Sequence, residues 1–104
     1  MQKEYNKAIR DKIPEIIKKT GKSCTVKQLE DPEFLTALEN KLMEEINEYY
    51  ESHSIEELAD LLEVIYRIAE LKGVTQKNLD QIRVQKNKDR GNFSKNLFLV
   101  SGEV

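Results

Sequence analysis

The chain has 104 residues, of which 38% are hydrophobic and 35% charged, and its formal net charge at neutral pH is −2. This length predicts a single domain (residues 1–104) with a small core, which favours further burial by self-association. The near-neutral charge excludes a general electrostatic attraction to nucleic acids or anionic membranes. Cys24 is the only cysteine, and no apolar run approaches the roughly 20 residues that span a bilayer, so we expect a cytoplasmic protein without membrane segments.

The first part of the chain predicts one short helix and one extended segment. The helix is expected over about residues 12–20, with Pro14 in its first turn and a stop at Gly21. Residues 24–29 alternate in polarity and predict extended backbone, with which the apolar tail 96–100 is a candidate to pair.

Two long helices follow, over about residues 32–53 and 55–72, and their connection is so short that they must form an antiparallel hairpin. Ser54 and Glu57 match a capping box, in which each side chain accepts a hydrogen bond from the backbone of the other. A fourth helix is expected over about residues 76–89. The sequence therefore predicts an all-α bundle that is built on this hairpin and completed by dimerisation.

The carboxylates of the two long helices fall in unusual places when side chains are projected at about 100° per residue. Glu45 and Glu57 lie inside apolar arcs, whereas Glu48 and Asp60 lie at the borders of these arcs and Glu44 points away. Buried carboxylates repel one another, and a basic partner, a raised pKa or a bound cation relieves the repulsion. Antiparallel packing would bring the four inner carboxylates together as an oxygen-rich site for Mg²⁺ or Mn²⁺.

The alternative is an ordinary solvated helix surface, since glutamate is a strong helix former and is common on exposed faces. Glu57 also has a sufficient structural role as the second member of the capping box. This alternative does not explain why Glu45 and Glu57 both fall inside apolar arcs.

The motifs "EINE" (residues 45–48) and "ELAD" (residues 57–60) resemble the paired E-x-x-E and E-x-x-D motifs of the MazG-like nucleotide pyrophosphohydrolases. The start "YNKAIRDKIPEII" and the end "RVQKNKDRGNFSKNLFL" look like the small-protein branch described as phosphoribosyl-ATP pyrophosphohydrolase-like, so the resemblance covers about residues 5–100. One departure is the short connection between the motifs (residues 49–56), which is longer in many family members and leaves little room for a substrate-selecting insertion.

The resemblance implies an all-α enzyme that hydrolyses a nucleoside triphosphate to the monophosphate and pyrophosphate, with a house-cleaning role as one form of this activity. Carried over by position, the Mg²⁺ ligands and catalytic residues would be Glu45, Glu48, Glu57 and Asp60. The expected partners are the nucleotide and a second copy of the chain, as a homodimer or a higher homo-oligomer.

Phosphate recognition should fall to side chains, because the four glycines are scattered and form no phosphate-binding loop. The candidates are the basic residues near both ends of the chain: Lys7, Arg10, Lys12, Arg83, Lys86 and Arg90. Arg10 and Arg90 stand within the family-like strings and are the strongest of the six. For each of these residues the alternative is a solvated surface charge.

Three functions fit these observations. The leading hypothesis is a Mg²⁺-dependent nucleoside triphosphate pyrophosphohydrolase, and the second is hydrolysis of phosphoribosyl-ATP in histidine biosynthesis, which would use the same site. The third is a non-catalytic helical interaction module, which predicts no pyrophosphate release and no stabilisation by magnesium. A nucleic-acid partner is the least favoured, given the overall negative charge.

Overall fold

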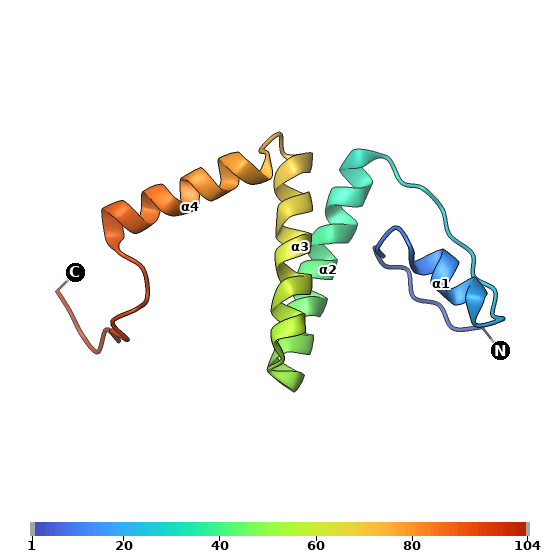
Figure 1. Cartoon of the computed structure of the whole chain (residues 1–104), viewed down its shortest axis with the longest axis horizontal. Helices are drawn as coiled ribbons and strands as arrows, with labels where there is room; N and C mark the ends of the chain where they lie inside the picture. The colour runs from blue at the N-terminus through green and yellow to red at the C-terminus, as the bar shows by residue number, and fades with distance from the viewer. Residues whose placement is uncertain (1, 104) are drawn as a thin grey trace.

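The computed structural model describes residues 2–103, which form four helices and no strand. They are α1 (Ile13–Lys19), α2 (Asp31–Ser52), α3 (Ile55–Leu71) and α4 (Gln76–Arg90). Helices α2 and α3 lie side by side as an antiparallel hairpin (Figure 1). The all-α fold and the predicted hairpin are therefore confirmed. None of the described helices is long and apolar enough to cross a membrane.

The connection between α2 and α3 consists of two residues that reverse the chain. His53 ends α2 in the left-handed conformation (φ 55°) and donates its backbone N–H to the carbonyl of Tyr49. Ser54 begins α3, and its Oγ accepts the backbone N–H of Glu57 at 3.4 Å. The second half of the predicted capping box is not formed, because the N–H of Ser54 donates to the Oγ of Ser52 instead. The carboxylate of Glu57 is therefore free of any capping role.

The core of the molecule lies where the N-terminal segment (residues 2–12) crosses the hairpin. Ala8 of this segment, Leu38 of α2 and Val64 of α3 are the buried apolar residues of the described chain. Five half-buried side chains pack around them: Phe34, Ala37, Leu42, Ile68 and Leu71. The small side chain of Ala8 lets the N-terminal backbone approach both helices, and this places the charged residues beside it over the hairpin.

The C-terminal arm, defined here as α4 and the tail over residues 91–103, projects away from the hairpin on the side opposite α1 (Figure 1). Among the helices, α4 packs only against α3. The radius of gyration is 18.0 Å, compared with about 13 Å for a compact chain of this length. The described chain is thus an elongated molecule with a poorly covered hairpin.

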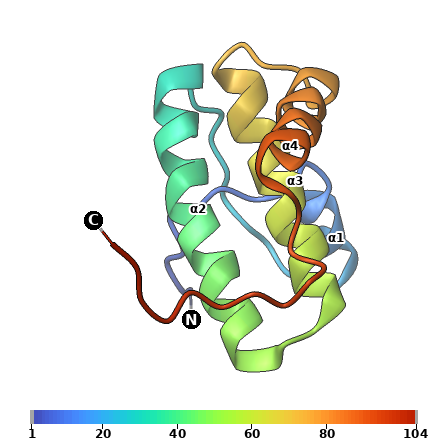
Figure 2. The ribbon, with the colours of Figure 1, turned by 90° about the vertical axis from the view of Figure 1, so that its left-hand side faces the viewer.

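The expected pairing of residues 24–29 with the tail 96–100 is wrong within one chain. The first segment runs beside α1 at one end of the molecule, and the second lies beyond α4 at the other end (Figure 1). In the view from the side of the arm, the tail crosses in front of the hairpin (Figure 2), but Figure 1 shows that it stands away from it. The direction of α4, which carries the tail outward, is the physical reason.

Candidate metal centre

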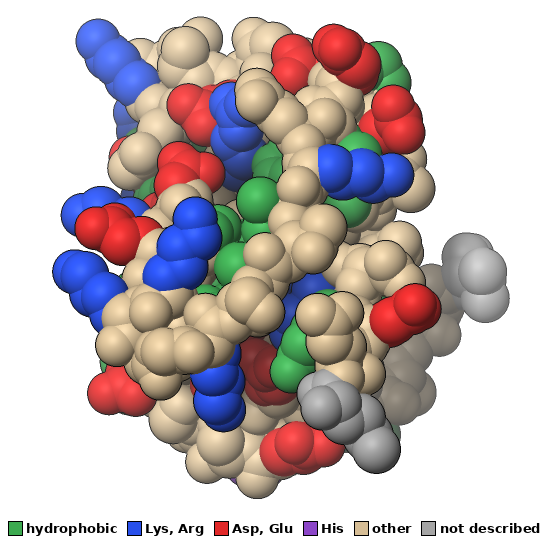
Figure 3. Space-filling view, turned by 90° about the vertical axis from the view of Figure 1, so that its right-hand side faces the viewer, with side chains coloured by type: hydrophobic (Ala, Val, Ile, Leu, Met, Phe, Trp, Pro, Cys, Tyr) green, Lys and Arg blue, Asp and Glu red, His purple; other side chains and the backbone are tan. Residues whose placement is uncertain are grey.

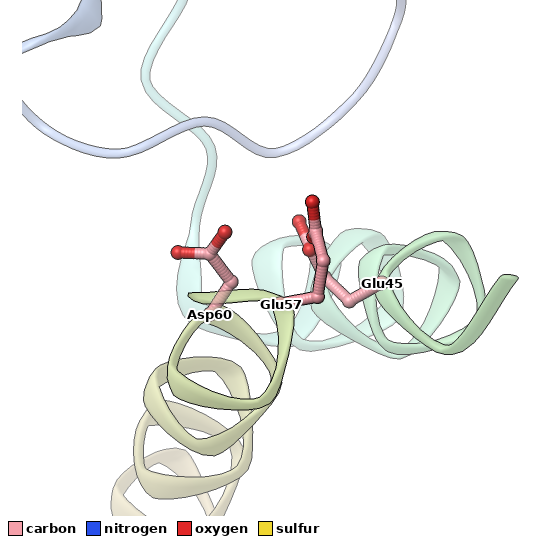
Figure 4. A group of neighbouring side chains, drawn as sticks. All are labelled: Glu45, Glu57 and Asp60. Atoms are coloured by element: carbon pink, nitrogen blue, oxygen red, sulfur yellow. The ribbon is translucent and has the colours of Figure 1, made fainter. Parts of the chain in front are cut away.

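Three carboxylates from the two long helices converge beneath the N-terminal segment. Glu45 extends from α2, and Glu57 and Asp60 extend from successive turns of α3, all toward the segment that passes over them (Figure 4). Each offers an oxygen atom, and these oxygen atoms all lie within 4.8 Å of one another. Glu48, the fourth predicted ligand, is half-buried beside this group and is not one of the three.

Burial makes two of these carboxylates exceptional. Glu45 is only 5% exposed and is the one buried charged residue of the described chain. The Oε2 atoms of Glu45 and Glu57 are both enclosed and have no hydrogen-bond partner. An enclosed oxygen without a partner is strongly unfavourable, so such atoms mark a place where a proton, a water molecule or an ion belongs.

The raised pKa values of the clustered carboxyls also indicate that positive charge is missing near them. Burial, reinforced by the negative charge of Glu48, raises the pKa of Glu45 to about 7. Burial also raises the pKa of the Glu57 carboxyl, with further contributions from Glu48 and Asp60. Both shifts mean that the surroundings disfavour the ionised carboxyl compared with one in water, and a divalent cation would supply the positive charge that offsets this.

Basic side chains border the carboxylates without satisfying all of them. The Nζ of Lys41 lies 3.4 Å from an oxygen of Glu45, and Arg10 donates to Asp60 at 2.8 Å. Lys7 donates to Glu44, also at 2.8 Å, and this pair raises the pKa of Lys7 and lowers that of Glu44. Glu44, which points away from the apolar arc of α2, is therefore half-buried by contact with the N-terminal segment.

A pocket of about 240 Å³ opens between the N-terminal segment and the hairpin. Glu45 and Asp60 line its acidic side, and Arg10, Lys41 and Arg67 contribute basic groups to its wall. In the space-filling view of the face that carries the N-terminal segment and α1, acidic and basic side chains are interspersed, and a recessed acidic patch is visible below the centre (Figure 3). The pocket therefore combines carboxylates, which could bind a cation, with basic groups suited to phosphate.

Sequence reasoning missed Lys41 and Arg67 as members of this site. The available signal for Lys41 was its position four residues before Glu45, which places both side chains on one side of the helix. Arg67 stood on the polar face of α3, and only the approach of the N-terminal segment turns part of this face into a pocket wall.

The six predicted phosphate-binding residues fall into two groups. Lys7 and Arg10 lie at the carboxylates, as described above. Lys12 is exposed at the start of α1. The other three belong to α4, on the far side of α3 from the N-terminal segment (Figure 1): Arg83, which is paired with Asp80 at 2.8 Å, and the exposed Lys86 and Arg90. Within the described residues of one chain, no hydrogen bond or ion pair joins α4 to the carboxylates.

Comparisons of this chain with protein-family models, with curated proteins and with solved structures found no match. Membership of the MazG-like superfamily stays a prediction that rests on the motifs quoted above. The geometry of the site must therefore carry the functional proposal.

Proposed function

We propose that this protein is a Mg²⁺-dependent nucleoside triphosphate pyrophosphohydrolase, which releases a nucleoside monophosphate and pyrophosphate. The observation that carries the proposal is the buried Glu45, whose Oε2 lacks a partner and which meets Glu57 and Asp60 across the hairpin. Several carboxylate oxygens in one place fit a hard cation such as Mg²⁺, with Mn²⁺ as a substitute. The single free Cys24 fits a reducing, cytoplasmic setting.

Different residues would bind the cation and the phosphates. Glu45, Glu57 and Asp60 would hold the cation, and Glu48 beside them would orient a water molecule or support a ligand. When bound, Mg²⁺ supplies charge neutralisation for the triphosphate and a more acidic water molecule. All of these roles require the carboxylates to be ionised.

Arg10 links cation binding to phosphate binding, because it contacts a carboxylate of the cluster and also lines the pocket. Its guanidinium now donates to Asp60, which is 41% exposed in its side chain, and it also lines the pocket. Once Asp60 binds a cation, it offers less negative charge to Arg10, and the guanidinium is free to bind a phosphate oxygen. Lys41, which is paired with Glu45, would be freed for phosphate in the same way when Glu45 binds the cation.

The size of the pocket limits which part of a nucleotide it holds. Its volume of about 240 Å³ lies below the roughly 300–1,000 Å³ that encloses a typical small ligand. Because the wall is charged, we assign it to the phosphate chain, and the base and sugar would lie outside. Hydrolysis of phosphoribosyl-ATP would use the same groups, so a panel of substrates is required to separate the two enzymatic hypotheses.

One observation favours the non-catalytic alternative. Lys41 and Arg10 already neutralise part of the cluster, so the carboxylates have structural partners without a metal ion. This leaves the enclosed oxygens of Glu45 and Glu57 unexplained, because neither is reached by a hydrogen bond.

The test measures pyrophosphate release over a panel of nucleoside triphosphates and phosphoribosyl-ATP, with and without Mg²⁺. Glu45→Gln should lower turnover at least ~100-fold by removing a cation ligand, while Glu51→Gln, the same change at an exposed position of α2, should leave it near wild type. Thermal unfolding provides a second readout. Mg²⁺ at ~100 times its dissociation constant should stabilise the wild type by about 2.7 kcal/mol, and it should stabilise Glu45→Gln far less.

The outcomes separate the three hypotheses. Turnover of nucleoside triphosphates alone supports the proposal, and turnover of phosphoribosyl-ATP alone assigns the site to that substrate. An absence of turnover, together with equal Mg²⁺ stabilisation of wild type and Glu45→Gln, would overturn the site and favour an interaction module.

A further inference from the structure

The N-terminal segment (residues 2–12) passes over the carboxylates (Figure 4), yet little of it is packed into the molecule. Ala8 is its one buried residue. Among the described residues, the backbone of residues 2–9 forms no hydrogen bond with a helix. The position of this segment over the site therefore depends largely on its side chains.

Two ion pairs join the segment to the hairpin. Lys7, which precedes Ala8, donates to the Oε1 of Glu44 on α2 at 2.8 Å. Arg10, which follows Ala8, donates to Asp60 on α3 at the same distance. Asp60 belongs to the proposed cation site and Glu44 does not. A bound cation would therefore weaken the pair of Arg10 and leave the pair of Lys7 intact.

Glu44 has a basic partner at each of its carboxylate oxygens. Its Oε1 accepts from Lys7, and its Oε2 lies 3.4 Å from the Nζ of Lys41. The hydrogen bond between Lys7 and Glu44 is the largest cause of the raised pKa of Lys7 and of the lowered pKa of Glu44, so both groups stay charged at neutral pH. This pair is thus a stable contact between the segment and α2.

The pocket separates the roles of the basic residues in the segment. The described residues that line the pocket include Arg10 but neither Lys7 nor Glu44. Arg10 is therefore placed to meet phosphate, whereas Lys7 lies outside the pocket. The sequence counted both as candidates for phosphate, and the structure distinguishes them.

Arg10 can bind a phosphate effectively only if its segment stays in place after the guanidinium leaves Asp60. A non-helical segment held by Ala8 alone would gain conformational freedom at that moment, and phosphate binding would have to overcome this entropy. Lys7 lies three residues before Arg10, so its contact with α2 keeps the backbone of Arg10 within at most about 11 Å of a fixed point.

We propose that Lys7 and Glu44 form a positioning pair, which anchors the N-terminal segment over the carboxylates so that Arg10 can bind the phosphate chain of the nucleotide. This inference rests on the proposed function and deepens it. It gives Lys7 a role that acts through Arg10, in place of a direct contact with phosphate.

The first test measures opening of the segment in the metal-free protein, without any substrate. Trypsin needs a locally unfolded stretch, so its rate of cutting after Arg10 reports the open population. Glu44→Gln should raise this rate about threefold, because a partly exposed ion pair stabilises the closed state by a factor of up to about five. Lys7→Gln should act alike and decides if Glu44→Gln does not fold.

Two controls accompany this test. Glu51→Gln makes the same chemical change at an exposed position of α2 and should leave the rate unchanged. Cutting after Lys86 in α4 reports opening away from the segment and should keep its wild-type rate in every variant. Cutting after Arg10 at the wild-type rate in both Glu44→Gln and Lys7→Gln would overturn the anchor.

The second test measures KM and kcat for pyrophosphate release. Lys7→Gln and Glu44→Gln should each raise KM about threefold to fivefold, because the apparent affinity falls with the fraction of closed segment, and should leave kcat within about twofold. The double variant should raise KM no further than the larger single effect, because both changes remove the same pair. A double effect equal to the product of the two single effects would overturn the pair.

A covalent link in place of the ion pair separates anchoring from direct phosphate binding. In a Cys24→Ser background, Lys7→Cys and Glu44→Cys are joined within one chain by a short bifunctional thiol reagent. The linked protein should recover the KM of the background, although both charges are gone. A KM that stays raised after linking would overturn the positioning role and show that the ammonium of Lys7 itself binds phosphate.

Failure of the proposed function has a different signature. A wild type that turns over no nucleotide would overturn the enzymatic proposal and with it the role of the pair in phosphate binding. The anchoring of the segment by Lys7 and Glu44 is decided by the trypsin rates alone, which require no activity.

Discussion

The α2–α3 hairpin and the C-terminal arm depart from the usual distribution of side chains in opposite ways. The hairpin encloses the carboxylate of Glu45 with an unpartnered oxygen, and the arm exposes Phe93 and the apolar residues 97–100. Both arrangements are unfavourable for an isolated chain, because buried charge lacks solvation and exposed apolar area orders water. The cation proposed for the hairpin would relieve the first, and the second copy expected from the sequence would relieve the second by covering the arm.

Helix α3 shows both arrangements, one on each of its faces. Its inner face packs Val64 into the core and directs Glu57 toward Glu45, while its outer face exposes Ile55 and Leu62. A helix that is apolar on two sides needs a neighbour on each. Within the described chain only the inner neighbour, α2, runs along its length.

The largest expected effect comes from truncating a core leucine of α2, compared with truncating a leucine on the outer face of α3. Leu38→Ala should lower the free energy of unfolding by roughly 3–4 kcal/mol at any protein concentration, because it leaves a cavity in a core with few buried residues. Leu62→Ala should lower it by less than ~1 kcal/mol in dilute solution, and by more at high protein concentration if the expected dimer forms there. Urea unfolding at two protein concentrations measures both. Equal losses in dilute solution would mean that the outer face of α3 is already covered within one chain.

A smaller effect should appear in the pH dependence of the metal-free protein. The folded-state pKa of Glu45 is about 7 and its ordinary value is 4.5, so between these pH values the folded state binds more protons than the unfolded state. Over this interval the stability should therefore fall by up to about 3 kcal/mol as the pH rises from 4.5 to 7, and the raised pKa of Glu57 acts in the same direction.

Urea unfolding in the presence of a chelator, at several pH values across this window, measures the slope. Glu45→Gln should flatten it, because the amide does not titrate, and saturating Mg²⁺ should also flatten it by favouring the ionised carboxylates. A wild type whose metal-free stability rises with pH over this interval would contradict the electrostatic description of the cluster.

The smallest effects are expected when the N-cap hydroxyl of α3 or of α4 is removed. The Oγ of Ser54 caps α3, and the Oγ1 of Thr75 caps α4 by accepting the backbone N–H of Asn78 at 3.1 Å. Ser54→Ala should lower the global stability by about 1 kcal/mol, because α3 belongs to the core. Thr75→Ala should change global stability by only a few tenths and should mainly speed amide exchange within α4. The same global loss for both variants would show that the arm unfolds together with the hairpin.

Much of the site was predictable because it lies on periodic elements. The inward direction of Glu45 and Glu57 followed from their positions among apolar residues, and the structure confirms that both have enclosed oxygen atoms. The reciprocal half of the capping box was predicted wrongly, since Ser52 competes for the N–H of Ser54. Local alternatives of nearly equal energy, such as two acceptors for one N–H, are not resolved by a motif.

The approach of the N-terminal segment was not predictable in this way. Lys7 and Glu44 are 37 residues apart, and Arg10 and Asp60 are 50 residues apart. Such pairs depend on where a non-helical segment crosses the hairpin, and no periodicity encodes that crossing. For this reason the sequence did not reveal that the N-terminal segment contacts Glu44, or that Arg67 lines a pocket.

By itself the sequence determined the helices and their limits, through Pro32 in the first turn of α2, the hydroxyl caps of α3 and α4, and Gly91 with its positive φ at the end of α4. These signals act within about four residues, so they survive in any tertiary context. Only the tertiary structure decided which charged groups surround the carboxylates and where α4 directs the tail. Those outcomes follow from the packing of Ala8 on the hairpin and from the orientation of one rigid helix after a short turn, which local interactions do not specify.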